Sequence, residues 1–117
     1  MASKITRIYT GLAGLPASKD PIRELLRVYS RVSRALERLP KESKYRITTE
    51  NLIEKRRQII VSTSDPLEVE KKIGDGICEE MIEHAKLELN LIGVMEKYQP
   101  WEPLEEKPPA DQWKWPL

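Results

Sequence analysis

Apolar residues recur at helical spacing in the segment that follows Asp20. Asp20-Pro21 is a typical helix start, because aspartate caps free amides and proline fits the first helical position, which needs no N–H. Pro40 disfavours the helical conformation at Leu39, so we expect a first helix from Asp20 to Leu39. Its apolar stripe contains Ile22, Leu25, Leu26, Tyr29, Val32 and Leu36.

Two weaker helical patterns follow. A second helix is predicted from about Glu42 to Ile60, with sparser apolar positions at Tyr45, Leu52, Ile53, Ile59 and Ile60. Ser64-Asp65-Pro66 repeats the helix-start signal, and a short helical piece is expected over residues 66–73. Gly74-Asp75-Gly76 then interrupts the pattern, since each glycine costs about 1 kcal/mol inside a helix. We interpret this run as a kink or tight turn; the alternative, a phosphate-binding loop, matches no phosphate motif.

The last predicted helix, from Ile77 to about Tyr98, has the clearest pattern. One broad apolar face contains Ile77, Cys78, Met81, Ile82, Ala85, Leu89, Ile92 and Met95. A second apolar stripe lies on another side and contains Leu87, Leu91, Val94 and Tyr98. A helix that is apolar on two sides must be covered on both. We expect helices to cover one side, and the C-terminal tail or a partner protein to cover the other.

The chain therefore reads as all-α: an N-terminal segment (1–19), a three-helix bundle (20–98) and an extended C-terminal tail (99–117). The tail holds five of the nine prolines and all three tryptophans. Proline at this density favours an extended, polyproline-like backbone, and tryptophan in a docked tail is a typical interface anchor. We expect the tail to bind a partner, with folding back onto its own bundle as the alternative.

Charge is divided between the two halves of the chain. Residues 1–61 carry 14 Lys and Arg against 6 Asp and Glu, whereas residues 62–117 carry 6 against 13. Five arginines stack along one side of the first predicted helix, opposite its apolar stripe: Arg23, Arg27, Arg31, Arg34 and Arg38. This arginine ridge could face an acidic protein, a nucleic acid or an anionic lipid, or be a solvated surface. Aromatic residues do not interleave it, which disfavours nucleic acid.

Candidate chemistry is sparse, and we predict no catalytic, metal or cofactor site and no cofactor. Cys78 and His84 are the single cysteine and histidine, and together they cannot complete a zinc site. Six residues apart on a helix, they point in directions about 120° apart, too far for a nucleophilic pair. Cys78 is better interpreted as a small buried hydrophobe. The first 19 residues include Lys4 and Arg7 and no acid, a composition that suits a weak mitochondrial import signal.

The tail carries a specific resemblance. Residues 101–116, which end in PPADQWKWP, resemble the C-terminal signature of the alpha-subcomplex accessory subunit 5 family of mitochondrial complex I, the NADH:ubiquinone oxidoreductase. Upstream segments agree in order and spacing: Thr10 to Leu15, Tyr45-Arg46, Gly76-Ile77, Glu79-Glu80 and Glu88 to Leu91. The resemblance covers nearly the whole chain and is weakest over residues 48–63.

The resemblance implies a non-catalytic subunit that supports assembly and stability of the matrix arm. It implies a peripheral location on the matrix side of the mitochondrial inner membrane. The sequence holds no run of 18 or more apolar residues, so we expect no membrane span, and we expect no nucleic-acid binding. The implied partners are the core iron–sulfur protein 3 subunit and alpha-subcomplex subunit 10. The expected partner-binding residues are the arginine ridge together with Leu87, Leu91, Trp101, Pro103, Leu104, Pro108, Pro109, Trp113 and Trp115. The alternative is a free-standing helical adaptor that docks through its tail.

Overall fold

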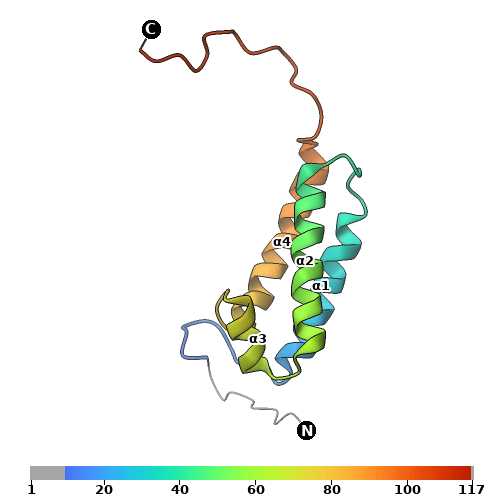
Figure 1. Cartoon of the computed structure of the whole chain (residues 1–117), viewed down its shortest axis with the longest axis vertical. Helices are drawn as coiled ribbons and strands as arrows, with labels where there is room; N and C mark the ends of the chain where they lie inside the picture. Colours follow the sequence, from blue (N-terminus) through green and yellow to red (C-terminus); the bar gives the residue numbers. More distant parts are fainter. Residues whose placement is uncertain (1–9, 117) are drawn as a thin grey trace.

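The computed structural model describes residues 10–116, and its regular structure there is entirely helical (Figure 1). The predicted all-α class is confirmed. The four helices of the described residues are α1 (Pro21–Leu36), α2 (Lys44–Ser62), α3 (Pro66–Ile73) and α4 (Cys78–Tyr98). Lys4 and Arg7, on which the import-signal interpretation rests, lie outside the described residues.

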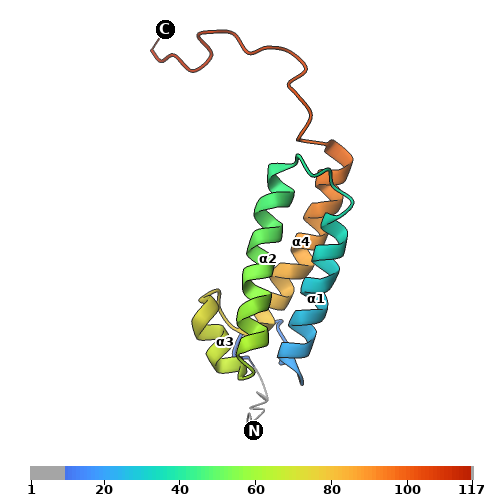
Figure 2. The same ribbon diagram turned by 45° about the vertical axis from the view of Figure 1, so that its right-hand side comes forward.

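Three long helices run side by side, and the short α3 packs at one end of them (Figures 1 and 2). Helix α1 contacts α4 most extensively and α2 to a lesser degree, whereas α3 contacts α2 and α4. The largest fully buried side chains are Leu25, Tyr29, Leu36, Leu39, Ile60, Met81 and Ile92. The core is thus mainly aliphatic, as the apolar stripes predict. Within residues 10–116, no helix combines the length and hydropathy that a membrane crossing requires.

The first helix is shorter at its C-terminal end than predicted. Asp20 caps it as expected, accepting a hydrogen bond from the Arg23 amide at 3.4 Å. Helix α1 ends at Leu36 rather than Leu39. The amides of residues 37–39 donate hydrogen bonds to carbonyl oxygens three positions back, not four as in an α-helix, and so form a tighter turn. Leu39 is still buried, so the turn before Pro40 contributes to the core.

The short helical piece expected over residues 66–73 is confirmed as helix α3, so the described residues form four helices rather than the three of the expected bundle. Asp65 caps its start, accepting a hydrogen bond from the Leu67 amide at 3.3 Å. Gly74 ends it in the left-handed conformation, with φ of 71°, which glycine adopts without steric cost. Val69 is completely buried. Local capping at both ends and one core contact therefore establish α3, with a tight turn after it.

Helix α3 also completes the start of α4. Ile77, at the cap position of α4, has no side chain that can accept a hydrogen bond from the helix. The Glu70 carboxylate of α3 takes this role and accepts a hydrogen bond from the Cys78 amide at 3.2 Å. A carboxylate is favourable here because it satisfies a free amide and opposes the positive end of the helix dipole.

Candidate subunit interface

The C-terminal tail leaves the bundle at the end of α4 and extends away from it (Figure 1, orange to red). Gln99 starts the change of direction, with a left-handed φ of 52°. The tail is irregular, and turns interrupt the expected extended backbone: the amides of Gln112 and Lys114 bond carbonyls three residues back at 3.1 Å. Trp113 and Trp115 are 90% and 87% exposed. Apart from Trp101, every tail residue that the structure describes is exposed, including Pro103, Leu104, Pro108 and Pro109.

Trp101 differs from the other two tryptophans because it contacts the bundle. It is half-buried and packs against the edge of the core. With Tyr45 and Met95 it lines a hollow of about 360 Å³ near the start of α2. The Tyr45 hydroxyl donates a hydrogen bond to the Glu88 carboxylate, which ties α2 to α4 beside this hollow. Burial and the Glu88 carboxylate raise the pKa of Tyr45. Trp101 thus attaches the base of the tail, whereas Trp113 and Trp115 stay free of the bundle.

The second apolar stripe of α4 is uncovered. Leu87 is 63% exposed and Val94 is 49% exposed, and Leu91 and Tyr98 are exposed on the same helix. The tail departs from the far end of α4 and does not fold back over this stripe (Figure 2). The sequence left the tail or a partner protein as the cover of this stripe, and the described part of the tail does not cover it.

The five arginines of the ridge are all exposed and lie on α1 or directly after it. At helical spacing they fall within an arc of about 80° and span roughly 22 Å along the axis. Arg38 pairs with Glu96 of α4, with 3.6 Å between nitrogen and oxygen. Within residues 10–116, the other four arginines form no ion pair. The ridge borders a hollow of about 560 Å³, where Arg31, Arg34 and Leu89 meet between α1 and α4.

A polar cluster that sequence reasoning missed joins three helices and the turn before α4. The Arg56 guanidinium on α2 donates hydrogen bonds to the Tyr29 hydroxyl of α1 at 3.3 Å and to Asp75 at 3.1 Å. His84 of α4 approaches the same Asp75 oxygen at 3.5 Å. Burial raises the pKa of Tyr29, and the hydrogen bond from Arg56 opposes this rise. The sequence offered one signal for this cluster, the acid Asp75 between two glycines. The glycines alone suffice for a turn, so the acid at this position indicates a partner for its carboxylate.

Cys78 and His84 have separate surroundings. Cys78 is buried, as expected, and its thiol donates a hydrogen bond to the Pro66 carbonyl oxygen with 3.8 Å between sulfur and oxygen. His84 is half exposed and faces Asp75 instead. Among the described residues, no three His, Cys, Asp or Glu side chains gather as metal ligands.

Comparison with known proteins agrees with the resemblance in the tail. The family model described as "ETC complex I subunit conserved region" matches residues 14–80, which contain α1, α2, α3 and the start of α4. The probable NADH dehydrogenase (ubiquinone) 1 alpha subcomplex subunit 5 of Caenorhabditis elegans is 40% identical over 108 residues, covering 92% of this chain and 72% of the relative. The subunit 5 of Bos taurus is 37% identical over 108 residues, covering 92% of this chain and 93% of the bovine protein.

A plant protein extends the comparison. The probable subunit 5 of Arabidopsis thaliana, whose name includes "mitochondrial", is 33% identical over 92 residues, or 79% of this chain and 54% of the plant protein. The family match spans more than half of the chain, and the bovine relative aligns over nearly its whole length. The chain therefore belongs to the family of NADH dehydrogenase (ubiquinone) 1 alpha subcomplex subunit 5, a family of complex I subunits.

Proposed function

We propose that this protein is a non-catalytic accessory subunit of respiratory complex I that supports assembly and stability of the matrix arm. The observation that carries the proposal is the exposed pair Trp113 and Trp115, on a tail that leaves the bundle. Tryptophan is among the residues that contribute most when buried at an interface. The prolines of the tail stiffen the free chain, so docking costs less conformational entropy.

The partners are other complex I subunits. From the family resemblance we infer the core iron–sulfur protein 3 subunit as the principal neighbour and alpha-subcomplex subunit 10 as a second. The tail supplies one contact, and the uncovered Leu87 and Leu91 supply another on α4. The arginine ridge supplies a third contact, which would require an acidic neighbour. The location is peripheral, on the matrix side of the mitochondrial inner membrane; the name of the Arabidopsis thaliana relative supports the organelle.

The proposal is tested by the size of the species that contains the protein. Cells expressing the full chain with an affinity tag are solubilised in a gentle detergent and fractionated by size. We expect the protein in a megadalton species together with other complex I subunits and NADH dehydrogenase activity. Recovery as a small soluble species instead, with the complex fully formed without it, would mean that the chain is a free-standing adaptor.

A further inference from the structure

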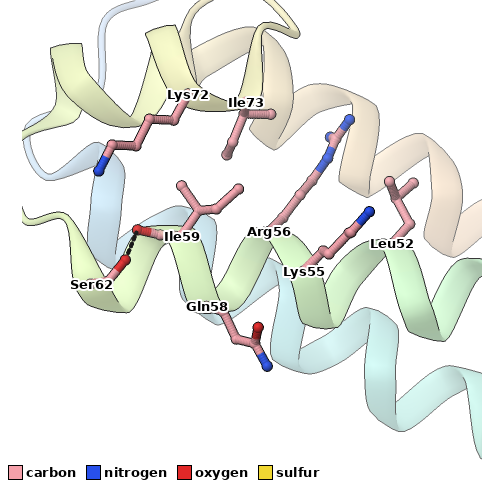
Figure 3. A pocket seen from close by; sticks show the side chains of 8 residues that line it. All are labelled: Leu52, Lys55, Arg56, Gln58, Ile59, Ser62, Lys72 and Ile73. Carbon is pink, nitrogen blue, oxygen red and sulfur yellow. Dashed lines mark hydrogen bonds between the residues drawn. The ribbon is translucent and has the colours of Figure 1, made fainter.

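A groove of about 680 Å³ lies between α2 and α3 (Figure 3). Leu52, Ile59 and Ile73 provide its apolar surface. Ile59 on α2 and Ile73 on α3 point toward each other across it (Figure 3). Leu52 is 48% exposed and Ile59 lies seven residues further along the helix, so both are on one face of α2. This face is adjacent to the one that Ile53 and Ile60 bury in the core.

The charged residues that line the groove are all basic. Lys55 and Arg56 come from α2 and Lys72 from α3, and no acid joins them. Arg56 is already engaged by Asp75. Lys72 donates a hydrogen bond to the neutral Thr63 hydroxyl at 2.8 Å. Among residues 10–116, neither Lys55 nor Lys72 forms an ion pair, so the groove has two uncompensated positive charges beside an apolar floor.

The described part of the tail does not occupy this groove. Helix α3 packs at one end of the bundle, whereas the tail departs from the other end (Figures 1 and 2). Helix α2 buries only Thr49, Ile53 and Ile60 among its 19 residues, so its outer side is open to another molecule. The groove also lies wholly within residues 14–80, the part that matches the family model.

We propose that the groove between α2 and α3 binds an acidic amphipathic segment of another protein subunit. Apolar side chains of that segment would occupy the space between Ile59 and Ile73, as in the docking of amphipathic helices into apolar grooves. Its carboxylates would pair with Lys55 and Lys72, which sets the orientation and disfavours basic or neutral segments. This inference rests on the proposed function, because the partner is another subunit of the same complex.

The test uses a thiol placed in the groove by Leu52→Cys in the full chain. The native Cys78 is buried, so the unsubstituted chain serves as the blank. Modification by N-ethylmaleimide is compared between the free chain and the chain within the purified large complex. We expect modification of the groove thiol to be at least about tenfold slower in the complex, because an interface core excludes solvent. The control Lys71→Cys, an exposed position on α3 that does not line the groove, shows that the reagent reaches the subunit.

A photoactivated cross-linker attached to the same thiol identifies the occupant. A cross-link to an acid-containing segment of another complex I subunit supports the proposal. A cross-link to a second copy of this chain, to lipid or to a basic segment overturns it, and so does an unchanged modification rate in the complex. Absence of the chain from the large complex would instead contradict the proposed function, so the two failures are distinguishable.

Charge reversal supplies an independent measurement. The pair Lys55→Glu and Lys72→Glu should lower incorporation into the complex by about tenfold, and more strongly as salt is reduced, because like charges repel over a longer range. The pair Lys41→Glu and Lys71→Glu changes the net charge equally at exposed positions outside the groove and should incorporate normally. Circular dichroism confirms that both variants fold. Equal incorporation of the two pairs would overturn the acidic character of the partner.

Discussion

At the scale of single residues, Arg56 of α2 links α1 to the turn before α4. Its guanidinium bonds to Tyr29 of α1 and to Asp75 in the turn before α4, and Asp75 in turn faces His84. Burial lowers the pKa of Arg56, but its hydrogen bond with Tyr29 and the Asp75 charge outweigh this and raise it. The guanidinium therefore stays charged, and the cluster depends on its presence.

The first prediction is that Arg56→Met destabilises the fold by about 1–3 kcal/mol, because it leaves the buried Tyr29 hydroxyl without its partner. Urea unfolding followed by circular dichroism measures the change. The control is Lys55→Met on the same helix, an exposed change that should stay within about 0.5 kcal/mol of the original protein. Equal stability of the two variants would show that the cluster is incidental to the fold.

The second prediction concerns the exposed tryptophans. Trp113→Ala with Trp115→Ala should sharply reduce incorporation into the complex, because each buried tryptophan contributes on the order of 2 kcal/mol as an interface anchor. Helical content should not change, since neither side chain contacts the bundle. The control pair Glu105→Ala and Glu106→Ala, in the same tail, should have little effect. Normal recovery of the tryptophan variant with the large complex would remove the tail anchors from the proposed interface.

At the scale of secondary-structure elements, α1 presents two opposite faces. One buries Leu25 and Val32, and the other presents the arginine ridge to solvent. Because the two faces are separate, the charge on one can be changed without disturbing the packing of the other.

The third prediction is that Arg27→Glu with Arg34→Glu weakens incorporation in a salt-dependent manner while α1 remains helical. Arginine and glutamate differ little in helix propensity, and salt screens interactions between exposed charges. Incorporation is measured across a series of salt concentrations and compared with that of the Lys41→Glu, Lys71→Glu pair, which carries the same net charge. If the ridge variant incorporates like the original protein, the ridge is only a solvated surface.

At the scale of the whole molecule, the tail packs against the core of the bundle through Trp101. Trp101 packs against the core, and the later tail residues of the described chain are exposed. The helices end at Tyr98, before the tail begins.

The fourth prediction is that deletion of residues 100–117 keeps most of the helical content but sharply reduces incorporation into the complex. Loss of Trp101 should lower the thermal midpoint of unfolding modestly, because its half-buried ring covers the core edge. Circular dichroism and recovery with the large complex are measured on the same preparation. Unfolding of the truncated protein would mean that the tail is part of the core; unchanged incorporation would mean that it is dispensable.

The fifth prediction is that Cys78→Ser with His84→Ala leaves complex I turnover unchanged in assembled complexes. The two residues have separate partners, Pro66 and Asp75, and lie in no shared site. Turnover per assembled complex is compared with that of the original protein. Loss of turnover with normal assembly would indicate a chemical role that the geometry does not suggest.

The starts of α1 and α3 were predictable because their signals are local, whereas α2 begins at Lys44 rather than near Glu42. Asp20-Pro21 and Asp65-Pro66 each place a capping carboxylate and a proline at adjacent positions, and both begin helices. The burial of Cys78 was predictable in the same way, because its neighbours along the helix place it on an apolar face. The end of α1 was less predictable, since the pattern continues to Leu39 while the backbone tightens after Leu36.

The sequence by itself determined the helical class, the starts of α1 and α3, the arginine ridge and the concentration of tryptophan in the tail. Only the tertiary structure decided that α3 packs against α2 and α4, that Trp101 separates from Trp113 and Trp115, and that Arg56 meets Tyr29 and Asp75. The tertiary structure also decided that Ile59 and Ile73 face each other across a groove lined with lysine. Caps and apolar stripes depend on neighbours within a few positions along the chain, whereas these contacts join residues from different elements, whose approach is set by how the helices pack.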